Sequence, residues 1–120
     1  MPGKELEKLQ SFLGTQSELQ GEVKIKGTLR LDGALKGKIE ADQVILGETA
    51  FLKGEILAKK IIIGGVVEGT LRAEELLEIS SKGRVKGEIF ANNLIVIEGG
   101  QFNGQIKMKA KDTNSVLPES

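Results

Sequence analysis

A five-residue pattern centred on glycine occurs six times in this chain. Each copy consists of an apolar residue, any residue, Gly, any residue and an aliphatic residue. The central glycines are Gly21, Gly37, Gly54, Gly69, Gly87 and Gly104. Successive glycines are 16, 17, 15, 18 and 17 residues apart. A repeat of this length is typical of a solenoid, in which each copy forms one turn of chain and stacks on its neighbours.

Apolar residues recur at even distances from these glycines. Two residues before the glycine stand Leu19, Leu35, Leu52, Val67, Val85 and Phe102. Two residues after it stand Val23, Ile39, Ile56, Leu71, Ile89 and Ile106. Four residues after it stand Ile25, Ala41, Ala58, Ala73, Ala91 and Met108. The positions between them are mostly polar, and this period of two predicts a strand with one buried face.

A second aliphatic run follows each of the first five glycines. Eight residues after the glycine stand Leu29, Ile45, Ile62, Leu77 and Ile95, and we expect them to form another buried column. Turn signals such as Asp32-Gly33 and Gly64-Gly65 end these runs. A β-sandwich of hairpins would explain the short strands, but it would not explain why like residues stack on like.

The repeat therefore predicts an all-β fold, a single-domain parallel β-helix of about six short turns over residues 14–108, stacked about 4.8 Å apart. Steps of 15 to 18 residues without a strict six-residue subdivision favour the right-handed form. We expect flexible segments on both sides. Residues 109–120 have no periodicity and are expected to form a disordered tail.

The segment of residues 1–13 has several interpretations. Leu6, Leu9 and Leu13 lie at helical spacing with Phe12 beside them. The segment could cap the first turn, contact a membrane surface weakly, or be disordered.

Composition excludes several classes of function. Seventeen Lys and Arg balance seventeen Asp and Glu, and the two signs are interspersed, so nothing suggests a nucleic-acid partner. The chain has no His and no Cys, which removes the commonest general base and the thiol nucleophile. Gly64-Gly65 and Gly99-Gly100 lack the Lys-Ser/Thr of a nucleotide-binding loop. We expect no catalytic site, no metal and no cofactor.

Two kinds of surface remain as candidate sites. The ends of a β-helix expose strand edges over an apolar stack, which predicts an assembly contact between them. The residues of that contact would be Phe102, Ile106 and Met108 at one end and Leu19, Val23 and Ile25 at the other. Consecutive apolar residues in the second runs also predict an apolar outer surface, which either pairs with a partner or packs under the N-terminal segment. The candidates for lateral or membrane contact are Leu6, Leu9, Phe12, Leu13, Leu46, Ile63 and Phe90.

The order of these motifs resembles the bactofilins, bacterial polymer-forming cytoskeletal proteins. The matching stretches are Phe12-Leu13-Gly14, Leu19-Gln20-Gly21, Gly27 to Gly33, Leu35 to Ile39 and Val85 to Ile89. The resemblance implies a right-handed β-helix that joins end to end into filaments without nucleotide. In the family such filaments often lie on the cytoplasmic membrane and scaffold cell-shape or cell-wall proteins. A bulky apolar residue of the last turn contributes to the subunit joint there, and Phe102 fits this role by position.

We therefore expect a structural protein whose main partner is another copy of itself. We expect it in the cytoplasm, because no signal peptide or membrane span is visible. The resemblance implies the membrane surface and cell-wall-associated proteins as further partners. The alternative is a monomeric or small-oligomeric binding module for a cell-wall polysaccharide or a partner protein. The chain has four Phe and no Trp or Tyr, and so it offers few aromatic platforms for a sugar.

Overall fold

The chain folds into a coil of parallel strands. The structure, a computed structural model, describes residues 11–13 and 18–108. Its strands are β1 (Ser11–Leu13), β2 (Glu18–Lys24), β3 (Thr28–Leu31), β4 (Ala34–Glu40), β5 (Gln43–Leu46), β6 (Phe51–Ile63), β7 (Val66–Ile79), β8 (Arg84–Ala91), β9 (Leu94–Val96) and β10 (Gln101–Met108). All pairings between them are parallel. The predicted all-β solenoid is confirmed.

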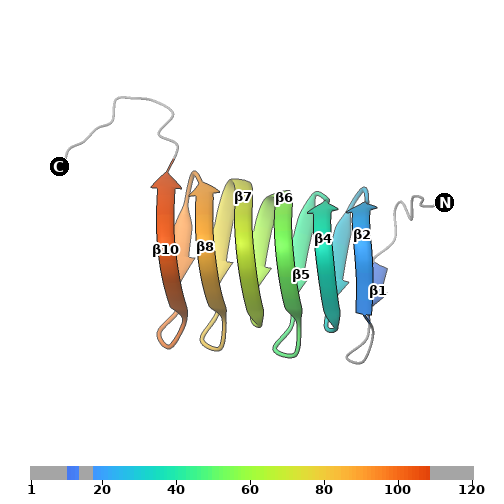
Figure 1. The fold of residues 1–120 in the computed structure, drawn as a ribbon. Helices are drawn as coiled ribbons and strands as arrows, with labels where there is room; N and C mark the ends of the chain where they lie inside the picture. The colour runs from blue at the N-terminus through green and yellow to red at the C-terminus, as the bar shows by residue number, and fades with distance from the viewer. Residues whose placement is uncertain (1–10, 14–17, 109–120) are drawn as a thin grey trace.

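The coil has two long ladders of strands. In one, which we call the glycine sheet, β2, β4, the first part of β6, the first part of β7, β8 and β10 follow one another. In the other, the back sheet, β1, β3, β5, the last part of β6, the last part of β7 and β9 follow one another. We call one full turn of chain through both sheets a rung. In Figure 1 the front strands run upward, the back strands run downward, and the chain advances from right to left, which makes the coil right-handed.

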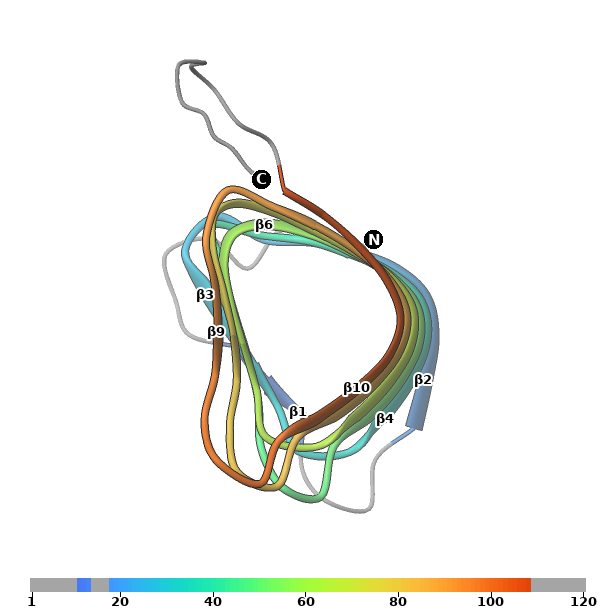
Figure 2. The ribbon, with the colours of Figure 1, turned by 90° about the vertical axis from the view of Figure 1, so that its left-hand side faces the viewer.

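The glycines of the repeat lie directly above one another in the glycine sheet. Gly21, Gly37 and Gly54 are register partners on successive strands, and Gly69, Gly87 and Gly104 continue the column. Each has a positive φ between 124° and 145°. Only glycine adopts such angles without strain, and the strand bends there. Seen along its axis, the coil therefore has a closed, roughly three-sided outline (Figure 2).

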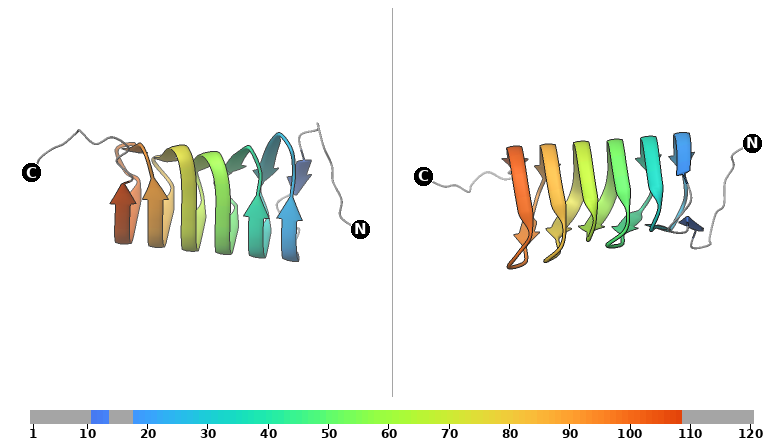
Figure 3. Two further views of the ribbon diagram at one scale, coloured as in Figure 1. Left: turned by 90° about the horizontal axis from the view of Figure 1, so that it is seen from above. Right: turned by 60° about the horizontal axis from the view of Figure 1, so that its bottom comes forward.

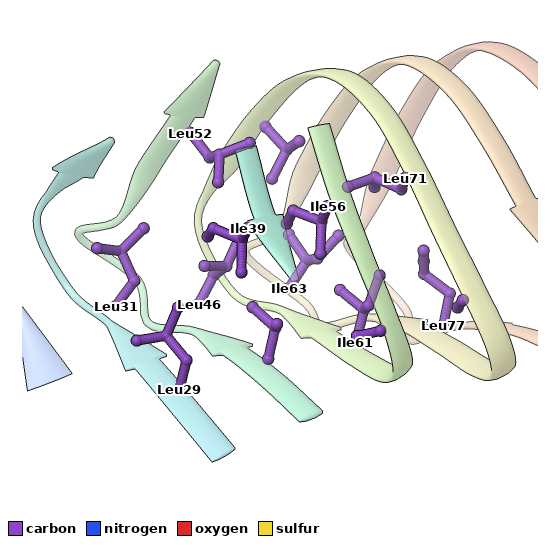
Figure 4. Packing of buried hydrophobic residues seen from close by; sticks show 14 of the residues in the cluster. Leu29, Leu31, Ile39, Leu46, Leu52, Ile56, Ile61, Ile63, Leu71 and Leu77 are labelled. Carbon is purple, nitrogen blue, oxygen red and sulfur yellow. The ribbon is translucent and has the colours of Figure 1, made fainter. Parts of the chain in front are cut away.

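The interior of the coil is a narrow stack of aliphatic side chains. The columns two before, two after and four after each glycine are buried in the middle rungs, as predicted; Leu52, Ile56 and Ala58 are 0%, 0% and 3% exposed. Figure 4 shows such side chains pointing into the coil from both sheets. No polar or charged side chain is buried among the described residues. The stack is therefore held by apolar burial, and the backbone ladders satisfy the strands' hydrogen-bonding groups.

The predicted fourth column is wrong at three of its five positions. The inward residues of the back sheet are Leu29, Val44, Ile61, Leu77 and Leu94, which are partners in register. Ile45 and Ile62 point outward, and Ile95 is 44% exposed. The reason is the corner before this sheet. Three residues separate Ala73 from Leu77, but only two separate Ala41 from Val44, so a fixed distance from the glycine does not follow one face.

The solenoid also begins earlier than predicted. β1 pairs with β3 through Ser11 opposite Leu29 and Leu13 opposite Leu31, so the back sheet starts at Ser11 and not after Gly14. A helix suggested by the spacing of Leu6, Leu9 and Leu13 therefore cannot extend over Ser11–Leu13, which form a strand. Leu6 and Leu9, and the expected tail of residues 109–120, lie outside the described residues.

Candidate assembly interface

The last strand of the glycine sheet has a partner on one side only. β10 pairs with β8 from Gln101 opposite Arg84 to Met108 opposite Ala91. On its other edge it meets no strand among residues 11–13 and 18–108. The two ends of the coil lie far apart, and the views in Figure 3 show β10 at one end and the first strands at the other. A strand edge of this kind presents N–H and C=O groups that can pair with another strand.

Apolar side chains of the last rung are exposed where their equivalents on earlier rungs are buried. Ile106 is 39% exposed, whereas Ile89 in the same column is 0% exposed. Met108 is 50% exposed, whereas its partner Ala91 is 2% exposed. Phe102 is half-buried and packs against the core. The difference arises because no further rung covers them, so all three residues predicted for this end offer apolar surface to a partner.

Sequence reasoning missed the contribution of the back sheet to this end. Val96 is 46% exposed, although Ile79 in the same inward column is fully buried. Leu94 is half-buried beside it and packs on the core. The sequence places this stretch in the last copy of the second aliphatic run, but counting from the glycine selects Ile95 as its inward residue instead of Leu94 and Val96. The apolar surface of this end therefore covers both sheets.

The outer side of the last strand is nearly uncharged. Gln101, Asn103 and Gln105 occupy the columns that hold Arg84, Lys86 and Glu88 on the preceding strand. Lys107 is the one charged residue of β10. Arg84, Lys86 and Glu88 remain exposed although β8 has a strand on each side, so the outer side chains of β10 would stay at the surface if another rung followed.

The first rung forms the opposite end. β2 pairs only with β4 among the described strands. Val23 is half-buried, but Ile25 is only 6% exposed and adds little area to a contact. Leu19 lies opposite Leu35 in register, and its side chain is not among those described. A Cβ atom on Gly21 would meet no atom within 4 Å, whereas Cβ atoms on the later glycines of the column would meet the preceding glycine's carbonyl. No described residue therefore occupies the position at Gly21 where another rung would stack.

The prediction of lateral contacts through Leu46 and Ile63 is wrong. The two side chains are 1% and 0% exposed and point into the core, because the period-two alternation places Ile45 and Ile62 on the outside instead.

Phe90 is half-buried on the outer surface of the glycine sheet, between Arg72 and Lys107. Its ring centroid lies 4.4 Å from Cζ of Arg72 and 5.6 Å from Nζ of Lys107. Phe12 and Leu13 lie in β1, and their side chains are not described.

The described surface carries charges in exposed pairs rather than in a reactive cluster. Lys24 lies 3.8 Å from Glu40, and Arg72 lies 3.7 Å from Glu55. A hydrogen bond from Nε of Arg30 to Asp32, together with the carboxylate's charge, raises the pKa of Arg30.

Among the described residues, no group of acidic side chains is arranged to hold a metal ion. An open hollow beside the last rung is lined by Arg72, Phe90, Lys107 and Met108.

In the part of the chain that the structure covers, no helix is long and apolar enough to cross a membrane.

Comparison with known proteins agrees with this architecture. A family model described as bactofilin, polymer-forming cytoskeletal, matches residues 11–107. The chain is 30% identical over 81 residues to bactofilin BacP of Myxococcus xanthus (strain DK1622), a match that covers 67% of this chain and 34% of the relative. It is 27% identical over 103 residues to bactofilin BacO of the same organism, covering 85% of this chain and 82% of the relative. The chain thus spans about a third of BacP and most of BacO. None of the solved structures matches it significantly.

Proposed function

The chain belongs to the bactofilin family of polymer-forming cytoskeletal proteins, and we propose that it assembles end to end, without nucleotide, into filaments that scaffold cell-shape or cell-envelope processes. The observation that carries this proposal is the exposure of Ile106 and Met108 in columns that are buried on earlier rungs. A soluble solenoid normally covers such a stack. A second subunit would cover it by continuing the coil.

The joint would combine two favourable contributions. Strand pairing at β10 would satisfy the N–H and C=O groups along its edge, as in the addition of a strand to a sheet. Burial of Phe102, Ile106 and Met108 at one end, and of Leu19 and Val23 at the other, would contribute roughly 25 cal/mol per Å² of apolar surface. Ile25 would add little, because it is only 6% exposed before assembly. Because both contributions are largely independent of charge, assembly is expected to persist at high salt.

Location and partners follow from the proposed scaffold. We place the filaments in the cytoplasm, where the membrane surface and cell-wall-associated proteins would be their partners. The N-terminal segment with Leu6 and Leu9 is the candidate for membrane contact. Neither catalysis nor a cofactor is needed for assembly of this kind. A chain that remained monomeric at high concentration would instead favour the role of a binding module.

The test of this proposal is a charge placed at the joint. Phe102→Arg introduces a cation that would lose its hydration without a partner, so filaments should disappear from the high-speed pellet. Met108→Glu should act in the same way, and it perturbs the subunit less because Met108 is already 50% exposed. Asn103→Arg is the matched control, because Asn103 is the neighbour of Phe102 on β10 and is exposed on the outer rim.

Circular dichroism checks that each variant keeps the β-helix. The proposal predicts that Phe102→Arg and Met108→Glu remain folded but in the supernatant, while Asn103→Arg still sediments. Long filaments from folded Phe102→Arg and Met108→Glu would refute the end-to-end joint.

A further inference from the structure

The outer surface of the back sheet carries two isoleucines between two charged residues. Arg30, Ile45, Ile62 and Glu78 lie in one column on four successive strands, and Ile95 follows them. Ile45 and Ile62 are half-buried, and Ile95 is 44% exposed. We call the outer surface of the back sheet around this column the back face.

The column has longer side chains on one side and short or absent side chains on the other. On one side stand Thr28, Gln43, Lys60 and Leu76, which are partners in register. On the other side stand Asp32, Gly47, Gly64 and Ser80, each directly after the strand of its rung. The two glycines have no side chain to hold a neighbour away. Figure 2 shows that the coil is nearly straight along this side.

Glu78 is the one acidic residue of the column. It is half-buried between Ile62 and Ile95. Within residues 11–13 and 18–108 it forms no ion pair. A carboxylate that loses hydration beside apolar side chains is destabilising unless a donor or a cation faces it. A partner that covers the back face would therefore have to bring a cation to Glu78, because the described part of the subunit supplies none.

We propose that a second copy of the chain packs on the back face with its coil axis antiparallel, so that neighbouring filaments contact one another laterally. This inference rests on the proposed filament. A twofold axis along the strand direction, between Ile45 and Ile62, sets Ile45 opposite Ile62 and Arg30 opposite Glu78. The other facing pairs are Gln43 with Lys60, Thr28 with Leu76, Asp32 with Ser80, and Gly47 with Gly64.

Charge decides between this arrangement and its parallel alternative. With the two coil axes parallel, each rung faces the same rung of the partner, which sets Arg30 opposite Arg30 and Glu78 opposite Glu78. Like charges that face one another are destabilising. The antiparallel arrangement brings no like charges face to face. Asp32 already positions Arg30, because Nε of Arg30 donates to Oδ2 of Asp32 at 3.0 Å, and the Arg30 side chain remains 48% exposed.

The contact is too small to hold two free subunits together firmly. A footprint of four rungs, at about 4.8 Å each, is only about 20 Å long. Stable complexes bury roughly 800 Å² on each partner. Along a filament, however, the same contact recurs on every subunit, and linked weak contacts bind far more tightly than one. We therefore expect lateral contact between filaments and little or none between single subunits.

The proposal is tested by reversing each charge and then combining the variants. Glu78→Arg sets Arg opposite Arg30, and Arg30→Glu sets Glu opposite Glu78. Each variant alone should form single filaments. The amount of protein in the low-speed pellet should fall about tenfold, and the filaments should appear in the high-speed pellet instead. Preformed filaments of the two variants, when mixed, restore opposite charges at both sites and should return to the low-speed pellet. Glu88→Arg is the control, because it makes the same change of charge on the outer side of β8.

The sedimentation results separate this inference from the proposed function. Wild-type protein in neither pellet would refute the filament itself. Wild-type filaments found only in the high-speed pellet would refute lateral contact alone. Glu78→Arg filaments that bundle like wild type, or mixed filaments that fail to bundle, would refute the antiparallel pairing of Arg30 with Glu78.

A second measurement identifies what covers the back face and does not depend on the charge variants. Because the chain has no cysteine, filaments of Ile45→Cys and of Ile62→Cys can be mixed and treated with a bis-maleimide of about 10 Å, the usual distance between packed sheets. Covalent dimers are expected in the mixture and not from Leu57→Cys, which lies on the glycine sheet. Absence of dimers would mean that something else, such as the N-terminal segment of the same chain, covers the face, and would overturn the proposal.

Discussion

A Cβ atom on Gly54 would overlap the carbonyl oxygen of Gly37 on the preceding rung. The same relationship connects each later glycine of the column to the one before it. The positive φ of Gly54, 144°, is a second reason for glycine here. The column therefore fixes both the bend in each strand and the close approach of neighbouring rungs.

Replacing Gly54 with Ala should destabilise the fold severely. The positive φ alone costs about 1–3 kcal/mol, and the overlap with Gly37 adds to that cost by forcing two rungs apart. Gly21→Ala has the same conformational strain but meets no atom within 4 Å. Thermal unfolding followed by circular dichroism should therefore give a much lower midpoint for Gly54→Ala than for Gly21→Ala. Equal midpoints would show that backbone strain, and not close approach, explains the glycine column.

Two adjacent residues of β6 should differ widely in their contribution to stability. Ile56 is fully buried, whereas Leu57 is half-buried on the outer surface. Ile56→Ala removes core packing and should lower the free energy of unfolding by about 2–5 kcal/mol. Leu57→Ala should lower it by less than about 1.5 kcal/mol, since less apolar area is involved. Urea unfolding at protein concentrations too low for assembly measures the free energy of unfolding of both variants. A larger loss for Leu57→Ala than for Ile56→Ala would contradict the assigned faces.

The corner after β4 depends on a side-chain acceptor. The N–H of Gly27 donates to Oδ2 of Asp42 at 2.9 Å, which connects the corners of two rungs. Asp42→Ala removes this acceptor and should lower the free energy of unfolding by about 1 kcal/mol. Asp42→Asn keeps an oxygen in the same place and should retain most of the stability. Urea unfolding compares the two, and an equal loss in both would mean that the charge of Asp42 matters rather than the hydrogen bond.

The exposed ion pairs should contribute little. Lys24 and Glu40 lie 3.8 Å apart, with side chains that are 78% and 45% exposed. Solvent screens such a pair, so Glu40→Gln should change the free energy of unfolding by less than about 1 kcal/mol. Thermal unfolding at low and high salt tests this, and a loss of stability well above that value would show that the pair is structurally important.

The part of the fold that follows the glycines could be predicted from the sequence, because the strand is continuous across the bend. Residues such as Leu35, Ile39 and Ala41 keep a constant offset from Gly37, and all three are buried. The back sheet follows a corner of variable length. Counting from the glycine therefore placed Ile45 and Ile62 in the core and left Leu46 and Ile63 as surface candidates.

The ends were harder to predict. Ser11–Leu13 is too short to display an alternating pattern, and the leucines before it have helical spacing. At the other end, the residues of the last copy identified Ile106 and Met108 correctly as exposed apolar side chains. Whether another subunit covers them is a property of two chains, so it remains a prediction.

Electron microscopy of the purified full chain, without nucleotide or metal, tests self-assembly most directly. Continuation of the sheets across the joints predicts filaments one coil wide, with a repeat of about 4.8 Å between rungs along the axis. Their subunit spacing should be roughly 30 Å, or twice that if neighbouring subunits alternate in direction. Particles that remain single coils at high protein concentration, with Ile106 and Met108 exposed to solvent, would contradict the account.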